Sequence, residues 1–353
     1  MTATSSSAAR DDRILLAHGG GGELMRELIR HEILPTLGGG CPPEPGGCGA
    51  ILADSAVLSD LPPGQIAFTT DSYVVKPLFF PGGDIGRLAV SGTVNDLAVV
   101  GASARALSLS FILEEGFPLA DFRRVLASVG ETAREAGAPV VTGDVKVVER
   151  GGADGLFINT AGVGVVPEGV LLGAGRVEPG DAVLLSGPIG NHGVAVLSAR
   201  QGIAFETTVE SDVAPLGELA EAVLTAGGAG VHWMRDPTRG GLAASLAELA
   251  EDGGVELTVV ESRIPVLAGV RAACELLGLD PLVVANEGKL VALVSADAAE
   301  AALSALKRHR LGAQAALIGY VSGRGQGRVV LQTRAGGRRL VELPYGEELP
   351  RIC

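Results

Sequence analysis

The sequence predicts an α/β protein of two domains. Its 353 residues exceed what one ordinary hydrophobic core accommodates. The composition, with 47% hydrophobic residues, 52 glycines, 3% aromatic residues and a mean hydropathy of +0.35, is that of a well-packed globular chain. Strand-like stretches alternate with helical patterns in both halves, and a glycine- and proline-containing break at 166–181 separates the halves.

The first half is predicted to carry four strands and two helices after a leader. Residues 1–50 form the leader with a glycine-rich loop, and 51–166 form the N-terminal domain. The strands are expected at 65–75, 105–115, 139–149 and 156–166, and the helices at 86–101 and 121–137. In the second helix Phe122, Val125, Leu126 and Val129 fall on one face, which is typical of a helix that covers a sheet.

The second half repeats the same alternation over 167–335, the C-terminal α/β domain. Strands are expected at 181–187, 255–260, 289–296 and 315–322, and helices at 215–227, 241–252, 266–277 and 297–309. Residues 336–353 are expected to be a tail. Its end, 344–353, has two prolines, a glycine and two adjacent glutamates, so it is predicted to be flexible and to join neither a helix nor a sheet.

Charge and hydropathy exclude several functional classes. With 28 Lys and Arg against 41 Asp and Glu, the net charge is −13 and the pI about 4.9, which disfavours nonspecific binding to nucleic acid or anionic membranes. The first residues lack an apolar signal segment, and the longest uncharged run, 182–199, contains Pro188 and His192 and does not suit a membrane span. Four cysteines in so long a chain favour a cytoplasmic location.

A run of four glycines, in "LAHGGGGELM", precedes the first helical pattern. Glycines let backbone N–H groups approach an anion closely, and a helix N-terminus attracts phosphate. The run lacks the Gly-Lys-Ser/Thr of a Walker A loop, so a flexible hinge explains it equally well.

Carboxylates stand alone in apolar surroundings at Asp54, Asp71, Asp96 and Asp144. Burying an unpaired carboxylate is costly, so each needs a cation or strong donors. The four together fit carboxylates that converge on Mg²⁺ carrying nucleotide phosphates, although caps and turns are the alternative explanation. Strand alternation places Thr142, Asp144 and Lys146 on one face, where the last two either form a plain ion pair or act beside a reacting group.

Two further stretches contain polar residues that could bind phosphate or act in catalysis. In "WMRDPTRGG", Thr238, Arg239, Gly240 and Gly241 open an amphipathic helix after Asp236, which predicts a second phosphate site. In "VVANEGKLVALV", Asn286, Glu287 and Lys289 interrupt a strand-like run. This interruption is either a turn or the position of a catalytic carboxylate.

The cysteines differ in their expected roles. Cys41 and Cys48 bracket a proline-rich loop without further metal ligands nearby, so a metal or redox role is disfavoured. Cys274 has the spacing of a buried small hydrophobic residue. Cys353 is the last residue, which excludes prenylation because that requires a cysteine four residues from the end.

Motifs along nearly the whole chain, from 15 to 353, resemble the HypE family of hydrogenase maturation proteins. They include "LAHGGGG", "TTDSYVVKPLFFPGGDIG", "GTVNDLAVVGA", "VTGDVKVVERG", "RDPTRGG", "ANEGKL" and, most specifically, the terminal "PRIC". The family belongs to the superfamily of aminoimidazole ribonucleotide synthetase and selenophosphate synthetase. Selenophosphate synthetases carry a Cys or Sec with a Lys near the glycine-rich loop, and neither stands at 18–23 here, which disfavours selenium chemistry.

This resemblance implies a fold and an activity. The fold has two α+β domains, and the N-terminal sheets of two subunits pair in a homodimer. A carbamoyltransferase, HypF, places a carbamoyl group on the terminal cysteine. An ATP-dependent dehydration then leaves a thiocyanate, and its cyanide passes to iron on a HypC–HypD scaffold for nickel-iron hydrogenase.

The resemblance and the chemistry of the residues together assign roles. Cys353 carries the group, Glu287 is the candidate base, and Lys146 stabilises developing charge or donates a proton. Mg²⁺ is assigned to Asp54, Asp71, Asp96, Asp144 and Asp236; ATP is assigned to His18, Gly19, Gly20, Gly21, Gly22, Asn95, Thr238, Arg239, Gly240 and Gly241. Two alternatives stay open: a related enzyme acting on a free small molecule, and a thiol carrier without catalytic activity.

Overall fold

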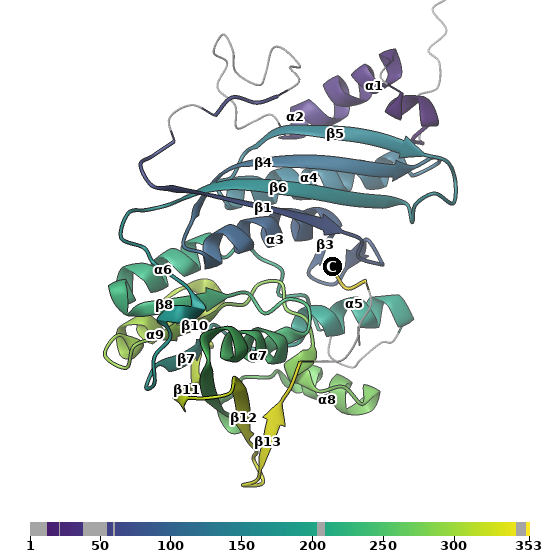
Figure 1. Ribbon diagram of the computed structural model, residues 1–353. Coiled ribbons are helices and arrows are strands. Elements are labelled where there is room, and N and C mark those ends of the chain that lie inside the picture. Colours follow the sequence, from purple (N-terminus) through teal and green to yellow (C-terminus); the bar gives the residue numbers. More distant parts are fainter. Residues whose placement is uncertain (1–12, 21, 38–54, 59–60, 203–208, 344–350) are drawn as a thin grey trace, which may run out of the picture.

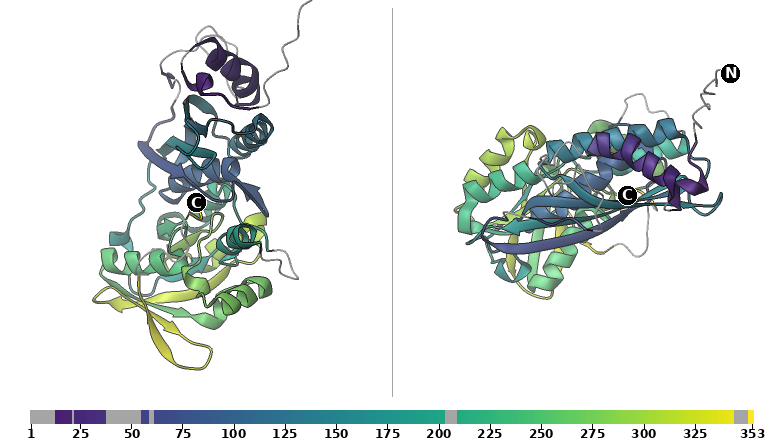
Figure 2. Two further views of the ribbon diagram at one scale, coloured as in Figure 1. Left: turned by 90° about the vertical axis from the view of Figure 1, so that its right-hand side faces the viewer. Right: turned by 90° about the horizontal axis from the view of Figure 1, so that it is seen from above.

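The computed structural model describes residues 13–20, 22–37, 55–58, 61–202, 209–343 and 351–353. Two domains, each built on its own sheet, lie one above the other, and the C-terminus lies between them (Figures 1 and 2). No helix among these residues is long and apolar enough to cross a membrane.

The N-terminal domain is a four-stranded sheet with the order β1-β6-β4-β5. The strands are β1 (Gln65–Tyr73), β4 (Ser103–Glu114), β5 (Val140–Val148) and β6 (Leu156–Val166), and only the β4–β5 pair is parallel. Helices α3 (Ile85–Val99) and α4 (Leu119–Glu135) cover the same face of the sheet (Figure 1). Phe111 of β4 meets Phe122 of α4 edge to face, with 5.1 Å between ring centroids, so the predicted apolar face of this helix packs on the sheet.

The other face of this sheet is open in the single chain. Ile66 and Phe68 of β1 are 60% and 69% exposed, and Ile112 of β4 is 39% exposed. Side chains on a strand alternate between faces, so these residues point away from the two helices. Lys146 is the register partner of Ile112 and lies on the same open face.

The leader packs against the β5 edge of the sheet. A 3₁₀ turn, η1 (Leu16–Gly19), precedes α1 (Glu23–Leu28), the π turn η2 (Ile29–Ile33) and α2 (Leu34–Leu37). A Cβ on Gly19 would lie 2.4 Å from the backbone nitrogen of Val147, so a glycine is needed for this close approach. A small hairpin of β2 (Phe79–Phe80) and β3 (Gly83–Asp84) leads into α3, where Asp84 accepts a capping hydrogen bond from the Arg87 N–H.

The C-terminal domain is a seven-stranded sheet with the order β13-β12-β9-β11-β7-β10-β8. Its strands are β7 (Ala182–Leu185), β8 (Val231–Arg235), β9 (Val255–Val260), β10 (Val291–Val294), β11 (Ala316–Arg324), β12 (Arg328–Gln332) and β13 (Arg338–Val341). Every residue of β7 and β10 is buried, because helices pack on both faces of the sheet here.

Five helices surround this sheet. α7 (Gly241–Gly253) packs on one face, and α6 (Gly217–Gly227) with α9 (Ala299–Arg308) packs on the other. α5 (Asn191–Gln201) lies near the domain boundary, and α8 (Ala268–Leu277) packs on it from the side away from the N-terminal domain (Figure 1). Short 3₁₀ turns join these elements at Ala174–Arg176, Gly228–Gly230, Glu261–Arg263, Pro281–Val283 and Arg310–Gly312.

The two domains share a packed boundary. Ala98 and Val99, at the end of α3, belong to the same apolar cluster as Leu216 and Leu219 of the C-terminal domain. The Asn95 side chain reinforces it: its amide donates to the carbonyls of Ala214 (3.2 Å) and Glu287 (3.3 Å). Helix α3 is therefore fixed against both domains.

The predicted strands and helices are present to within a few residues of their expected ends, but the helix α5 and the strands β2, β3, β8, β12 and β13 were missed. These strands have two to five residues, too few for a clear period. The expected tail at 336–353 is partly wrong, because β13 pairs antiparallel with β12 and belongs to the sheet. The flexible part of the prediction falls on 344–350, outside the described residues.

Candidate active site

A small cavity of about 30 Å³ lies between the two domains, where several sequence elements meet. The end of β1, the middle of α3, the turn before α7, the loop before β10 and the end of the chain all contribute. It is lined by Asp71, Ser72, Tyr73, Gly92, Asp96, Asp236, Thr238, Arg239, Glu287 and Cys353. Seven of these were candidates from the sequence, and the last residue of the chain is among them.

Asp71 and Asp96 bring two carboxylates to this cavity from β1 and α3. Asp71 Oδ1 accepts a hydrogen bond from the Ser72 N–H at 2.9 Å and lies 3.9 Å from a guanidinium nitrogen of Arg239. Asp96 Oδ2 accepts from the Thr69 hydroxyl at 2.8 Å. Burial raises the pKa of Asp96, with a further contribution from the nearby charge of Asp71.

Asp236 and Glu287 face the cavity from the C-terminal domain and are almost completely buried, at 6% and 2% exposure. Burial, with the charge of Asp96, raises the pKa of Asp236 to about 7. Burial, with the charges of Asp236 and Asp212, raises the pKa of Glu287 well above its ordinary value. Asp236 Oδ2 and Glu287 Oε1 have no hydrogen-bond partner among the described residues. Burying a carboxylate oxygen without a hydrogen-bond donor is costly unless a proton or a bound cation balances its charge.

The carboxylates do not form a ready-made metal cage. In the described part of the chain no three His, Cys, Asp or Glu side chains come close enough together to hold a metal ion by themselves. Mg²⁺ is usually held by one or two carboxylates together with phosphate oxygens and water. The unpaired, mutually repelling oxygens of Asp236 and Glu287 near Asp71 and Asp96 therefore fit an ion that arrives with a nucleotide.

The turn before α7 presents a helix N-terminus to the same cavity. Gly240 and Gly241 have φ of 72° and 60°, a region that favours glycine. A Cβ on Gly241 would also lie 2.5 Å from the carbonyl oxygen of Leu282, so the tight turn requires a glycine there. The positive end of α7, together with Thr238 and Arg239, can bind phosphate oxygens.

Not every predicted nucleotide ligand faces the cavity. Asn95 is fully buried, and besides its two donated bonds its Oδ1 accepts from the Leu216 N–H at 2.7 Å. Asn286 has a similar bracing role, accepting from the Gly190 N–H and donating to the carbonyl of Pro237. These two amides hold the loops that carry the site.

Lys146 and Asp144 lie outside the cavity, on the open face of the N-terminal sheet. They form an exposed ion pair of 2.7 Å on the open face, opposite the buried Val145, as strand alternation predicted. Asp71 faces α3 on the other side of the sheet. Three strand spacings, about 14 Å, also separate β5 from β1. Within one chain these two residues do not reach the cavity.

The glycine-rich loop lies beside β5 and not at the cavity. His18 Nδ1 accepts a hydrogen bond from the Leu15 N–H at 2.8 Å and so caps the first turn. Gly19, Gly20 and Gly22 accompany it along the β5 edge. Gly21 and Asp54 lie outside the described residues, as do Cys41 and Cys48.

The end of the chain is docked. The Val74 N–H donates to the carbonyl of Cys353 at 3.4 Å, and the Lys76 N–H donates to that of Arg351 at 3.3 Å. Ile352 is 2% exposed and belongs to the N-terminal core cluster. The last three residues form neither helix nor strand, as expected, but they do not hang free. No sequence pattern predicted that residues 351–353 would be bound in this way.

Several supporting residues were missed or had other roles. The Lys289 ammonium lies 3.2 Å from Asp212 Oδ2 behind the cavity, and Asp212 Oδ1 accepts from the Glu287 N–H at 3.3 Å. A lone Asp in "ESDVAP" carried no period or motif that marked it. Cys274 is buried, which confirms the prediction of a buried small hydrophobic residue, and burial raises the pKa of its thiol to about 11.

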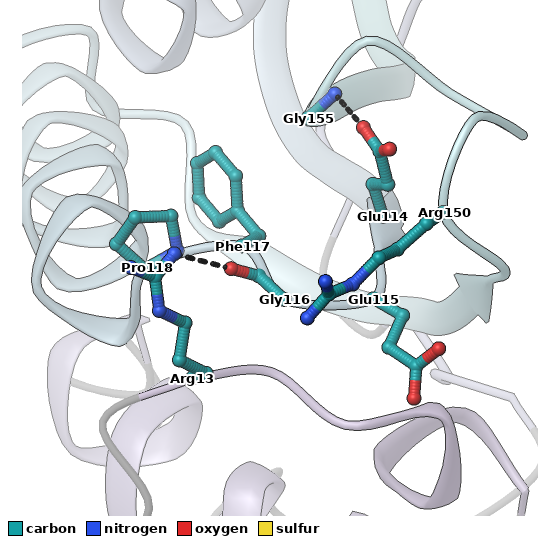
Figure 3. A pocket seen from close by; sticks show the side chains of 8 residues that line it. All are labelled: Arg13, Glu114, Glu115, Gly116, Phe117, Pro118, Arg150 and Gly155. Atoms are coloured by element: carbon teal, nitrogen blue, oxygen red, sulfur yellow. Dashed lines mark hydrogen bonds between the residues drawn. The ribbon is translucent and has the colours of Figure 1, made fainter.

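A larger, open hollow of about 520 Å³ lies where β4 ends (Figure 3). It is lined by Arg13, Glu114, Glu115, Gly116, Phe117, Pro118, Arg150 and Gly155. Arg13 donates to the Gly116 carbonyl, and Glu114 accepts from the N–H groups of Gly151 and Gly155. None of the candidate residues lines it, and its polar groups hold loops in place.

Comparisons with known proteins agree with this architecture. The N-terminal domain model of the AIR synthase related proteins matches residues 52–166, and their C-terminal domain model matches 178–332. Carbamoyl dehydratase HypE of Rhizobium leguminosarum bv. viciae is 51% identical over 97% of this chain and 95% of that protein. HypE of Escherichia coli K12 is 46% identical, over 97% of this chain and all of its own.

Solved structures of HypE proteins are also similar to this chain over most of its length. A crystal structure of hydrogenase maturation protein HypE in complex with ATP has a TM-score of 0.89 and 46% identity, and it covers 96% of this chain and 99% of its own. A HypE–HypF complex matches with a TM-score of 0.77 and 43% identity, over 92% of this chain and 100% of its own. On its two matched domains and its full-length relatives, the chain belongs to the HypE family of the AIR synthase related proteins.

Proposed function

We propose that this protein is an ATP-dependent carbamoyl dehydratase that acts on its own C-terminus. The observation that carries the proposal is that Cys353 lines the same cavity as Asp71, Asp96, Asp236 and Glu287. The names of the relatives, carbamoyl dehydratase, and the ATP complex of a similar structure support the reaction type and the nucleotide.

In the proposed reaction the terminal thiol carries a carbamoyl group, S–C(=O)–NH₂. The amide oxygen attacks the γ-phosphate of ATP, ADP leaves, and the nitrogen loses a proton. The C–O bond then breaks, the oxygen leaves with phosphate, and the nitrogen loses its second proton to give S–C≡N. An amide oxygen is a poor leaving group, and phosphorylation converts it into a good one.

Each cavity residue has a proposed part. The α7 N-terminus with Thr238 and Arg239 binds the phosphates, and Asp71, Asp96 and Asp236 hold Mg²⁺ beside them. When bound, that ion neutralises phosphate charge. Glu287 takes the proton from the amide nitrogen at Oε1, the oxygen without a hydrogen-bond partner among the described residues. A carboxylate with a raised pKa is the stronger base once its own proton is lost.

Lys146 takes part only if a second copy of the chain supplies it. The open face carries Ile66, Phe68 and Ile112, an apolar surface that a homodimer would cover. Because Ile112 and Lys146 are register partners, whatever covers the one lies against the other. We therefore propose that the N-terminal sheets pair, and that Lys146, with Asp144 and the glycine-rich loop, completes the site of the partner copy.

The proposal includes partners and destination. A solved HypE–HypF complex supports HypF as the protein that carbamoylates Cys353. The thiocyanate then gives its cyanide to iron on a HypC–HypD scaffold for nickel-iron hydrogenase. A cytoplasmic location stays a prediction of the cysteine usage. An enzyme for a free small molecule is disfavoured, because the chain's own terminal cysteine lines the cavity in which such a molecule would have to react.

Mass spectrometry of the C-terminal peptide tests the reaction. After treatment with HypF, carbamoyl phosphate and ATP, we expect the mass of one carbamoyl group and then the loss of one water. The Cys353→Ala variant should keep the fold and ATP binding, but show neither change. A cyanide-bearing product from Cys353→Ala protein would overturn the proposal, and a carbamoylated peptide that never loses water would reduce the protein to a carrier.

A further inference from the structure

The last three residues are held by contacts that the proposed chemistry does not use. We propose that Asp154, His192 and Arg200 form a clasp that recognises Arg351 and Ile352, and thereby sets how long Cys353 stays in the cavity. The claim that these residues position Cys353 for catalysis rests on the proposed function. The claim that they bind the C-terminal peptide does not depend on it.

The first part of the clasp recognises the Arg351 side chain. Its guanidinium forms an ion pair with Asp154 and donates from Nε to the carbonyl of Val74 at 3.0 Å. The guanidinium carbon lies 5.8 Å from the ring centroid of Phe157. Asp154 also pairs with Lys76 at 3.2 Å, so the carboxylate binds two cations. A planar guanidinium suits this combination of carboxylate, carbonyl and ring better than an ammonium group.

The loop that presents Asp154 is itself fixed. Glu114 accepts hydrogen bonds from the Gly151 N–H at 2.7 Å and the Gly155 N–H at 2.9 Å (Figure 3 shows the second). These two bonds lower the pKa of Glu114, which keeps it ionised. The open hollow near β4 is thus the back of the clasp, and Asp154 is held in position before the tail arrives.

The second part binds the backbone of the tail. His192 is fully buried, and its Nε2 lies 2.9 Å from the carbonyl oxygen of Ile352. Burial lowers the pKa of His192, so the ring is neutral and Nε2 donates to that carbonyl. Its Nδ1 then accepts from the Ser211 hydroxyl at 2.8 Å. The ring meets Phe80 edge to face at 5.4 Å, which fixes its orientation.

Arg200 joins the tail to the strand end beside it. Its guanidinium donates to the carbonyl of Arg351 and, at 2.7 Å, to that of Lys76. The tail runs antiparallel to Val74–Lys76, with backbone bonds from Val74 and Lys76 to Cys353 and Arg351. Residues 351 and 352 are therefore recognised by side chain and backbone, while the Cys353 side chain is left to line the cavity.

The strengths of these contacts suit a reversible clasp. The Arg351 and Asp154 side chains are 36% and 40% exposed, and an ion pair with that exposure contributes little because water screens it. Ile352 is the one fully buried apolar side chain of the last three residues, so the apolar area buried by the tail is limited. A tail held in this way is docked for most of the time and still released often enough to reach another protein.

The rate at which iodoacetamide alkylates Cys353 measures release. The docked Cys353 is only partly exposed and lines a cavity of about 30 Å³, so we expect release of the tail to raise the alkylation rate. Alkylation is followed on the purified full-length protein, without ATP or partners, by mass spectrometry of the C-terminal peptide. Cys274, which is buried, reports on unfolding in the same sample.

The variants are chosen on both sides of the contact. Asp154→Asn and Arg351→Gln each remove one partner and should raise the alkylation rate about three- to tenfold. The double variant should react no faster than the faster of the two single variants, because the ion pair between the two residues is already lost in each of them. Glu149→Gln removes an exposed charge from the same loop and should leave the rate unchanged. His192→Phe, which keeps the ring and loses the donor, should raise it about tenfold.

The outcomes separate clearly. Arg351→Gln cannot damage the body of the protein, so an unchanged rate in that variant overturns the clasp even if His192→Phe fails to fold. Additive effects of Asp154→Asn and Arg351→Gln, or an equal rise with Glu149→Gln, overturn it as well. A wild-type rate equal to that of a free peptide would show that the tail is not docked in solution. None of these results depends on whether the protein dehydrates a carbamoyl group.

Discussion

Two acidic regions of the N-terminal domain look alike in the sequence and differ in the structure. Asp71 and Asp96 lie on the helix-covered side, beside the buried Asp236 and Glu287, and the pKa values of the last three are raised. Asp144 lies on the open side and pairs with Lys146 in solvent. We call the first group the cavity half and the second, with the glycine-rich loop, the edge half.

The difference teaches that a carboxylate on a strand acquires its role from the face on which it lies. Alternation puts Asp71 toward α3 and Asp144 away from it, although both stand in strands of one sheet. In the cavity half, burial disfavours the charged form of the carboxylates, and a bound cation would stabilise that form. In the edge half, the charge of Asp144 is already neutralised by Lys146. If both halves serve one reaction, two chains must bring them together.

Mixing two inactive variants gives the largest effect. Lys146→Ala and Glu287→Gln should each lower turnover about a hundredfold or more, the usual loss for a proton-transfer group. An equal mixture should recover about a quarter of wild-type activity, because about half of its dimers are heterodimers and each heterodimer has one intact site of two. Activity assays on the mixture, refolded or co-expressed to allow exchange, check this.

The matched control is a mixture of Lys146→Ala with Asp144→Asn, both in the edge half. That mixture should recover no more activity than the two variants show by themselves, because both sites of each heterodimer receive an edge half that carries one of the two changes. No recovery at all in the first mixture would mean that Lys146 acts within its own chain or not at all.

Asp96→Asn should abolish ATP turnover, by about a hundredfold, because it removes a proposed ligand of Mg²⁺. The apo-protein should keep its fold and melt no lower, since one of several mutually repelling carboxylates is gone. Asp144→Asn is the comparison from the edge half and tests whether that carboxylate also serves the ion. Wild-type ATP turnover by folded Asp96→Asn protein would remove this residue from the site.

The pH dependence of stability separates the halves without any assay of activity. Asp236 has a pKa of about 7 in the folded protein against an ordinary value of 3.8. Between these values the folded state holds a proton that the unfolded state has released, so stability falls as pH rises from 4 to 7. Above pH 7 the cost is a few kcal/mol, and below pH 4 it vanishes.

Thermal melts in EDTA between pH 4 and 8 measure this effect. Asp236→Asn should flatten the fall, so that the variant is more stable than the wild type at pH 8 and equal to it at pH 4. Mg²⁺ at pH 8 should raise the wild-type midpoint and leave the variant nearly unchanged. Parallel curves for wild type and variant would argue against the buried charge.

The smallest expected effect concerns the open face. Phe68→Ala should weaken self-association about tenfold, because a large exposed apolar side chain is lost from the proposed dimer surface. Analytical ultracentrifugation over a range of concentrations checks this. Leu276→Ala, which shortens an exposed side chain on α8 in the other domain, is the control and should leave association unchanged.

The sequence by itself determined the two-domain α/β class, most strands and helices, and most of the cavity half. Periodicity and turn residues are local, so the long elements could be located from them, and Asp236 with Thr238 and Arg239 stood in one recognisable turn. The short strands β12 and β13 carried too few residues to show a period, and part of the sheet was taken for tail.

Only the tertiary structure decided which candidates meet. Asp71 lies 216 residues before Glu287, and Glu287 lies 66 residues before Cys353. Their convergence depends on how α3 and the last three residues pack between the domains. Asn95 was assigned as a ligand from the motif that it shares with Asp96, yet its amide is used to hold the domain boundary. His192 and Asp154 bind the tail through contacts that join distant segments, and no local pattern encodes such contacts.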